Sequence, residues 1–244
     1  MKNKDTIFKQ EMSSIEDFSF NENISNVFYD MARRSIPGYE YLIKNIGEFS
    51  KHFIQNNSNI YDLGCSIGDA TLSISQNIDS LKLENINIIG IDLSSSMSEK
   101  AKINLNNYKL KYKPRILTQD ILKTEIKDAS FVVLNFTMQF IKPTKREDLL
   151  KNIFNNMLPG SALIISEKVL LDDPFINEFL VKKYYDFKKV NGYSSLEINQ
   201  KRIALENVMQ LDSLDIHLKR LTKIGFKANS WFQNLNFISF IAIK

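Results

Sequence analysis

The sequence has few of the residues that define several large classes of proteins. It contains a single cysteine, Cys65, and only two histidines, which stand far apart in the chain. One cysteine cannot form an internal disulfide, so we expect a reducing compartment. Isolated histidines without neighbouring cysteines do not have the ligand spacing of a zinc site, and we predict no metal.

Long apolar runs are also missing. No stretch approaches the roughly 20 apolar residues that cross a membrane. The first 20 residues lack the apolar centre of a secretory signal, so we expect a cytoplasmic protein without membrane contact. Lysine and arginine number 32 and aspartate and glutamate 28, which leaves a net charge of only +4. Because these charges are mixed along the chain, we expect no direct binding of nucleic acid.

Short apolar runs alternate with helix-like segments from residue 58 onward. Strands are predicted at 59–64, 86–94, 114–120, 129–136 and 161–167, and helices at 68–79, 95–107 and 144–157. Strands that are apolar on both faces and alternate with helices predict a parallel sheet covered on both sides. A mostly helical segment follows, and two final strands around residues 233–236 predict an antiparallel hairpin at the sheet edge.

The N-terminal quarter of the chain has helical spacing with one interruption. Pro37-Gly38 cannot lie inside a helix, so the helical pattern must break there. We therefore predict an N-terminal helical extension over 1–57 and a Rossmann-like domain over 58–244 with a helical insertion at about 173–224. The fold class is α/β, with a mostly parallel seven-stranded sheet.

Two glycines lie four residues apart between the first strand and its helix, in DLGCSIG at 62–68. Glycine permits a tight turn and a close approach of a ligand, and a helix N-terminus offers unpaired N–H groups. An ordinary turn is an equal alternative. The order is not G-x-G-x-x-G, so a dinucleotide pyrophosphate lacks its usual glycine.

Polar residues stand at the carboxyl ends of the next three strands. Asp92 lies 28 residues after Gly64 and could bind both ribose hydroxyls; a helix cap is the alternative, although the serines that follow can supply the cap. Asp120 with Ile121 could read an adenine edge or form a simple turn. Asn135 is either a ligand contact or a helix cap. Their shared edge of the sheet favours a nucleoside site.

Several longer segments carry a family resemblance. They read VFYDMARRSIPGY, YDLGCSIGDATLS, VVLNFTMQFI, DFKKVNGYSSLEINQKR and WFQNLNF, in this order. In them the chain resembles the carboxy-S-adenosyl-L-methionine (carboxy-SAM) synthases, whose fold is the Rossmann-like fold of S-adenosyl-L-methionine (SAM) dependent methyltransferases. Ordinary methyltransferases do not share SIPGY or the NGYS…KR segment, so the resemblance is specific.

The resemblance implies a reaction and partners. It implies a carboxyl transferase that converts SAM and prephenate to carboxy-SAM and phenylpyruvate. Prephenate would lose its carboxyl group and ring hydroxyl, and a sulfonium ylide formed from the SAM methyl group would capture the CO₂. A homodimer is implied, as is a functional link to a tRNA carboxymethyltransferase that modifies wobble uridine in the 5-oxyacetyluridine pathway.

The resemblance also implies site residues. SAM contacts are expected at Tyr39, Gly64, Cys65, Ser66, Asp92, Leu93, Asp120, Ile121, Asn135 and Arg202. Asn135 would lie near the reacting end, and Arg202 would bind the new carboxylate bidentately, which lysine does less well. From the residues alone, Arg202 is better explained as a solvated helix position. Whether it acts in its own subunit or across the dimer stays open, as does the base that takes the methyl proton.

Other residues have open roles. Arg34 is a candidate for binding prephenate, because it directly precedes SIPGY, and Phe136 or Phe140 could line a ring pocket. Cys65 could be a nucleophile at a helix N-terminus, but the lack of a nearby histidine favours a small packing residue. Asp69 adds a charge that the helix dipole favours, and we expect no functional effect.

Two competing interpretations remain. A conventional small-molecule methyltransferase would use the same strand-end residues but needs no arginine for a transferred carboxylate. A non-catalytic SAM-binding partner protein would bind the ligand without turnover.

Overall fold

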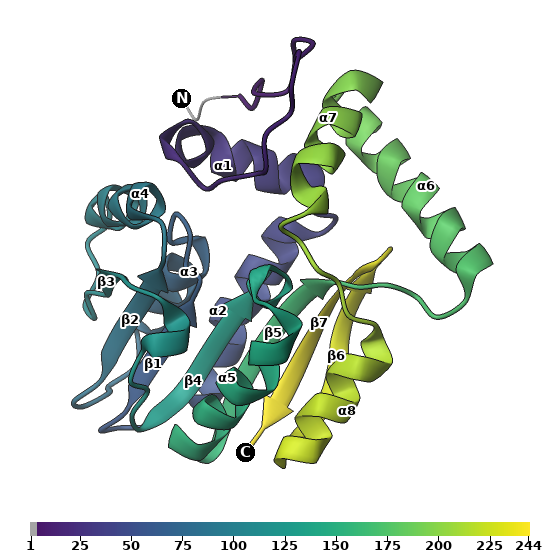
Figure 1. Cartoon of the computed structure of the whole chain (residues 1–244). Helices are drawn as coiled ribbons and strands as arrows, with labels where there is room; N and C mark the ends of the chain where they lie inside the picture. The colour runs from purple at the N-terminus through teal and green to yellow at the C-terminus, as the bar shows by residue number, and fades with distance from the viewer. Residues whose placement is uncertain (1–3) are drawn as a thin grey trace.

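A seven-stranded sheet forms the centre of the computed structural model, which describes residues 4–244 (Figure 1). The strands follow the order β3-β2-β1-β4-β5-β7-β6. Their bounds are β1 Asn59–Leu63, β2 Asn87–Asp92, β3 Arg115–Thr118, β4 Ala129–Asn135, β5 Met157–Lys168, β6 Lys227–Asn234 and β7 Phe237–Ile243. Strands β1 to β5 pair in parallel, whereas β7 is antiparallel to β5 and β6. The predicted sheet with its terminal hairpin is confirmed.

Helices cover both faces of this sheet. Strand side chains alternate between the faces, so neighbouring residues of β4 enter different cores. Phe131 and Val133 pack with α2 (Tyr39–Phe53) and α3 (Asp69–Ile78). Val132 and Leu134 pack on the other face with α5 (Pro143–Asn156) and α8 (Leu214–Ile224). Helix α4 (Ser95–Asn106) lies beside β2 and β3.

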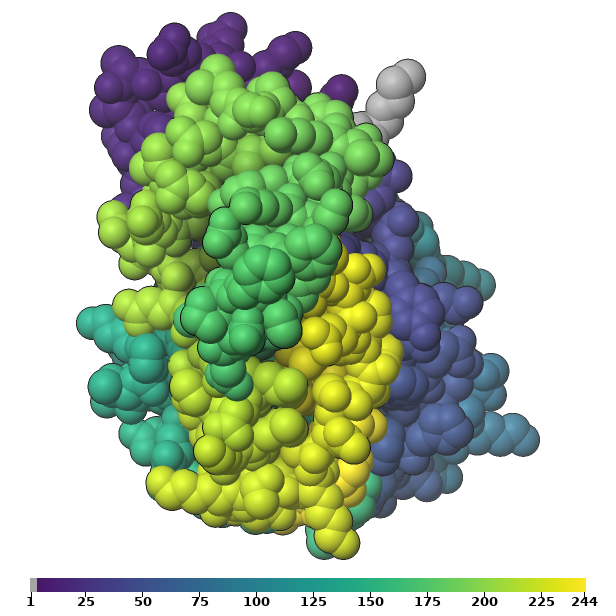
Figure 2. Space-filling model, turned by 90° about the vertical axis from the view of Figure 1, so that its right-hand side faces the viewer, coloured from purple at the N-terminus to yellow at the C-terminus, as the bar shows by residue number. Residues whose placement is uncertain are grey.

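Three further helices lie above the carboxyl ends of the parallel strands (Figure 1). They are α1 (Glu22–Ser35), α6 (Pro174–Val190) and α7 (Ser195–Glu206). A capping box formed by Ser194 and Glu197 begins α7. Gln200 of α7 holds the segment before α1, donating to the carbonyls of Phe8 and Gln10 at 3.0 and 2.8 Å. In Figure 2, α6 and α7 form one continuous surface next to the β6–β7 hairpin.

The sequence placed the helix ends around the sheet to within one residue, and the break between α1 and α2 falls at the predicted proline and glycine. Strand β5 differs, because it begins at Met157 and not at residue 161. Its register shifts at this point: Ala129 pairs with Met157, but Phe131 pairs with Ala162. Within residues 4–244, no helix combines the length and apolar character needed to cross a bilayer.

Candidate functional site

The end of β2 is tied to the loop after β1 through Asp92. The backbone N–H of Ser66 donates to Oδ2 at 2.8 Å, and that of Ser94 donates to Oδ1 at 2.9 Å. The side chain of Ser94, in turn, accepts from Met97 N and caps α4. Asp92 therefore holds a loop and is not the helix cap. Burial raises the pKa of Asp92 above its usual range, because the charged carboxylate is poorly solvated. A ligand hydroxyl that donates a hydrogen bond to the carboxylate would stabilise its charged form.

The glycine-rich loop after β1 lies against the turn that follows β4. Gly64, Ser66 and Gly68 all have positive φ, at 82°, 50° and 87°. A Cβ added at Gly64 would lie 2.3 Å from Oγ1 of Thr137, so only glycine fits there. Cys65 is buried, and burial together with the Asp62 charge raises the pKa of its thiol well above the ordinary value. This supports the packing interpretation of Cys65 over a nucleophile.

Acidic groups lie around the start of α3, and one of them, Asp62, is buried. Oδ2 of Asp62 accepts from Oγ1 of Thr71 at 2.6 Å, while its Oδ1 is buried without a hydrogen-bond partner in the part of the chain that the structure describes. Burial raises the pKa of Asp62 to about 6, with smaller contributions from the charges of Asp92 and Asp69. The hydroxyl of Tyr39 donates to Oδ2 of Asp69 at 2.9 Å. An acceptor-rich corner of this kind suits a cationic ligand group such as an ammonium or sulfonium.

Asn135 ends β4 with an unused acceptor. Its side-chain Oδ1 is buried and has no hydrogen-bond partner among residues 4–244, so a ligand group that donates a hydrogen bond would satisfy it. The loop that follows is fixed by Glu167, whose carboxylate accepts from the N–H groups of Met138 and Gln139 at 2.8 and 2.9 Å. Burial raises the pKa of Glu167 to about 8. Glu167 therefore positions the turn that carries Asn135.

The end of β3 offers one engaged acid and a neighbouring apolar surface. Asp120 accepts from Leu122 N at 2.9 Å and caps the 3₁₀ helix η1 (Ile121–Lys123), so the turn interpretation holds for this oxygen. Ile121 is buried, whereas Leu93 after β2 is 74% exposed. An exposed leucine beside a row of carboxylates suits a flat ligand that is apolar on its faces and polar at its edges.

Arg202 lies away from this row. It is on α7, with its side chain about half exposed, and its polar contacts within residues 4–244 are on the same helix: Oδ1 of Asn199 at 3.2 Å and Oε2 of Glu206 at 3.7 Å. The residues of α7 that face inward include Gln200 and Lys201, which contact the N-terminal segment and Ser35. Within one chain, the structure thus groups the strand-end residues but leaves Arg202 on an outer face.

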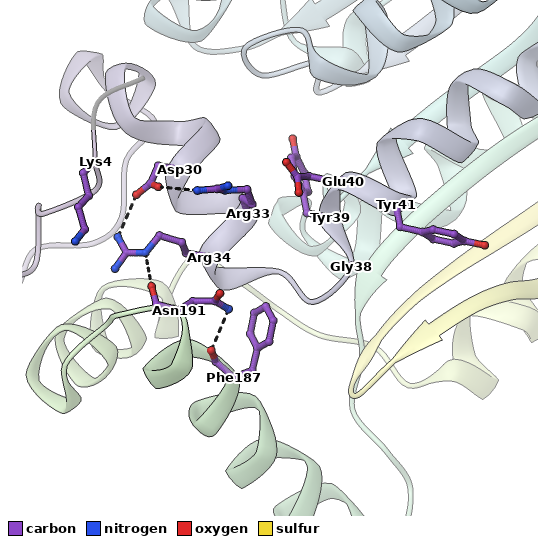
Figure 3. A pocket seen from close by; sticks show the side chains of 10 residues that line it. All are labelled: Lys4, Asp30, Arg33, Arg34, Gly38, Tyr39, Glu40, Tyr41, Phe187 and Asn191. Atoms are coloured by element: carbon purple, nitrogen blue, oxygen red, sulfur yellow. Dashed lines mark hydrogen bonds and ion pairs between the residues drawn. The ribbon is translucent and has the colours of Figure 1, made fainter. Parts of the chain in front are cut away.

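Arg34 is held by protein contacts through Nε and Nη1, while its Nη2 is buried without a hydrogen-bond partner among residues 4–244. It borders a hollow of about 760 Å³ at the α1–α2 junction, and Figure 3 shows its guanidinium between Asp30 and Asn191. Nε donates to the Asn191 carbonyl at 2.7 Å, and Nη1 donates to Oδ2 of Asp30 at 3.0 Å and to the Asp5 carbonyl at 3.1 Å. These bonds join α1 to the N-terminal segment and the α6–α7 turn, which gives Arg34 a structural role.

Sequence reasoning missed Asp69 and Glu167 as supporting residues. Asp69 stands 30 positions from Tyr39, and Glu167 stands 28 and 29 positions from the N–H groups that it binds. No local pattern predicts such contacts. The one available signal for Glu167 was an acid inside an apolar strand, since a buried carboxylate must find donors.

Comparison with known proteins adds family information to this geometry. A methyltransferase domain family matches residues 60–160. The chain is 48% identical over 245 residues to carboxy-S-adenosyl-L-methionine synthase from Aliivibrio fischeri and 45% identical over 245 residues to that from Idiomarina loihiensis, each covering 100% of both chains. An O-methyltransferase family protein from Burkholderia thailandensis has the same fold, with a TM-score of 0.65 at 11% identity, covering 91% of this chain and 59% of that one. These findings support the predicted use of SAM.

Proposed function

The chain belongs to the family of carboxy-S-adenosyl-L-methionine synthases, and from this premise we propose that it converts SAM and prephenate to carboxy-SAM and phenylpyruvate. The observation that carries the proposal is the full-length similarity to these enzymes at 45–48% identity, which includes α1, α6 and α7 as well as the sheet. A methyltransferase fold alone would not support a carboxyl transfer.

The strand-end row is where SAM would bind. Asp92 would accept from the ribose hydroxyls, with the side chain of Leu93 against the nucleoside. Asp120 and the N–H of Ile121 would read the adenine edge, and the Gly64–Ser66 loop would line the amino-acid part together with Tyr39. The unpaired oxygens of Asp62 and Asn135 support this placement, because each needs a donor or a positive charge that SAM carries.

The chemistry would proceed at the Asn135 end of this row. The SAM methyl carbon loses a proton, and prephenate loses CO₂ and its ring hydroxyl as its ring becomes aromatic. The carbanion then forms the new C–C bond to CO₂, and the proton and hydroxide combine as water. The chain would contribute orientation, exclusion of water by α1, α6 and α7, and negative charge near the sulfonium from Asp62 and Asp92. The leaving hydroxide is our candidate for the base.

Arg202 would meet the new carboxylate in a homodimer. Its outward position on α7 supports a contribution to the neighbouring subunit's site more than to its own. A planar guanidinium can bind a carboxylate through two parallel hydrogen bonds, and Glu206 at 3.7 Å is a weak competitor on an exposed helix face. We extend the proposal accordingly: the enzyme acts in the cytoplasm as a homodimer.

The product would serve as a carboxymethyl donor. A carboxylated sulfonium has no use in ordinary methylation, so a second enzyme must consume it. We propose a tRNA carboxymethyltransferase that modifies wobble uridine, without direct binding of tRNA to this chain.

The test is an incubation of the purified protein with SAM and prephenate, followed by mass spectrometry. We expect a species heavier than SAM by one CO₂, with equimolar phenylpyruvate, and neither without prephenate. Transfer of a plain methyl group to a small acceptor, with no use of prephenate, would establish the conventional methyltransferase. Tight SAM binding with no conversion under either condition would leave a SAM-binding partner protein.

A further inference from the structure

Three lysines come together where β5, α6 and α7 meet. Lys168 ends β5, Lys188 lies in the last turn of α6, and Lys201 lies in the middle of α7. The Nζ atoms of Lys168 and Lys188 lie 4.8 and 4.4 Å from the centre of the same ring, that of Tyr184. Lys188 and Lys201 are 5% and 7% exposed. Lysines are rarely buried to this degree unless they are paired.

Within residues 4–244, none of these lysines forms a direct ion pair with a carboxylate, and only Lys201 feels the charge of more distant ones. The charges that act on Lys188 are the positive ones of Lys201 and Lys168. Lys201 donates to Oγ of Ser35 at 3.0 Å and senses Asp5, Asp30 and Arg34 at longer range. Burial lowers the pKa of Lys168 and Lys201 to about 8, and burial with the neighbouring lysines lowers that of Lys188 to about 6. An anion brought from outside would stabilise the charged form of all three amines.

The lysine group adjoins the reacting end of the SAM site. Lys168 and Asn135 lie on neighbouring strands, and alternation places both side chains on the same face as Val133 and Ile164. Aromatic rings connect the two positions. Phe237 contacts Phe136, the residue after Asn135, at 6.0 Å between ring centres, and Tyr184 at 5.1 Å.

We propose that Lys168, Lys188 and Lys201 form the site that binds the carboxylates of a ring-bearing dicarboxylate. Phe136, Phe237 and Tyr184 lie against its ring. The identity of this ligand as prephenate rests on the proposed function. Two carboxylates match this group of three lysines, since a bound dianion would stabilise the protonated amines that burial and mutual repulsion disfavour in the free protein. Phe140 is a poorer ring contact, because it packs edge-on against Phe20 at 5.2 Å.

The test is calorimetric titration of prephenate into protein saturated with S-adenosylhomocysteine, which lacks the carbon that reacts. Wild-type protein is compared with Lys168→Met and Lys188→Met. Lys182→Met is the matched control, because Lys182 lies on the outer face of α6 and pairs with Glu178. We expect binding at least tenfold weaker in both test variants and unchanged in the control. Melting curves should show both test variants folded, since methionine removes a buried charge.

The outcomes test the proposed prephenate site and the proposed reaction independently. Failure of the wild type to bind prephenate, or wild-type affinity in both lysine variants, overturns the site. Turnover is measured separately in the incubation with SAM. Lysine-dependent binding without formation of carboxy-SAM would support the site and contradict the proposed function. Formation of carboxy-SAM by both lysine variants at the wild-type KM for prephenate would support the proposed function and contradict the site.

Discussion

Tyr39 and Asp69 join the first residues of two helices through a hydrogen bond of 2.9 Å from the tyrosine hydroxyl to Oδ2. Tyr39 begins α2 and Asp69 begins α3, so the bond sets the spacing of two helix N-termini beside the Gly64–Ser66 loop. Burial, reinforced by Asp69, raises the pKa of Tyr39 well above its ordinary value, so the hydroxyl stays a donor. Asp69 thus supports a residue expected to contact SAM, although the sequence predicted no functional effect for it.

Removing this hydroxyl tests its importance. We expect Tyr39→Phe to lower the free energy of unfolding by about 1 kcal/mol and to weaken SAM binding, because Asp69 loses its donor. Calorimetry with SAM and urea unfolding provide the two measurements. Tyr41→Phe is the control, since that ring is 57% exposed. Equal SAM affinity in Tyr39→Phe and the wild type would contradict the contact.

Asp92→Asn should weaken SAM binding by roughly tenfold or more. A neutral amide accepts weaker hydrogen bonds from ribose hydroxyls than a carboxylate, and its NH₂ group would clash with the N–H of Ser66 or Ser94. Titration with SAM measures the change, and Asp148→Asn on the exposed face of α5 is the control. Undiminished affinity would mean that Asp92 is only a loop anchor.

Arg34→Ala should destabilise the protein by about 3 kcal/mol, because it removes the buried partner charge of Asp30 and leaves two carbonyl groups without the guanidinium donor. Arg33→Ala is a close control: Arg33 pairs with the same Asp30, but at 3.7 Å and with half of its side chain exposed. We expect less than about 1 kcal/mol there. Urea unfolding of both variants and the wild type measures the two changes in the free energy of unfolding. Wild-type stability with a raised KM for prephenate would instead make Arg34 a ligand contact.

The Lys188 ammonium should make stability depend on pH in a definite direction. Its folded-state pKa of about 6 lies below the ordinary lysine value of 10.5, so between these values the unfolded chain binds more protons and this residue's contribution to stability rises with pH. Lys188→Met should therefore stabilise most near pH 6 and progressively less toward pH 9, by at most about 1.4 kcal/mol per pH unit. Paired melting curves of variant and wild type, from pH 6 to 9, measure the difference. A constant difference would contradict a buried, uncompensated Lys188.

Mixed dimers can locate the action of Arg202. Arg202→Ala should be inactive alone, and Asp92→Asn should have little activity when the SAM concentration is kept well below the KM of that variant. If Arg202 serves the neighbouring subunit, a mixed dimer has one complete site, so random mixing should restore about a quarter of wild-type activity. Carboxy-SAM formation after co-refolding is the measurement. No recovery, in mixtures shown to contain mixed dimers, would place Arg202 in its own subunit's site.

Local patterns predicted the elements of this fold because they depend on neighbours in sequence. Burial on both faces gave the parallel strands their apolar runs, and Pro37-Gly38 marked the break between α1 and α2. The start of β5 was missed since Pro159 and Gly160 have the composition of a turn, whereas the structure carries the strand through them with a register shift.

The candidate site could be proposed from the sequence only where it lies at strand ends. Asp92 and Asn135 could be found because parallel strands bring their carboxyl ends to one edge. Lys168, Lys188 and Lys201 come from three elements, and each has the sequence context of an ordinary solvated lysine. Their burial depends on how α6 and α7 pack over the sheet, which no local periodicity encodes. Arg34 was considered from its position in a motif, but its partners Asp5 and Asn191 are distant in sequence.

The contact of Gly64 with Thr137 has a mechanical consequence. A side-chain atom at Gly64 would lie 2.3 Å from Oγ1 of Thr137, so the two turns already touch and neither can move toward the other. This contact keeps the turns after β1 and β4 from moving closer together. A ligand proposed to reach from Ser66 to Asn135 therefore cannot be gripped more tightly by closing these turns, and a shorter ligand would leave a gap that the protein cannot close.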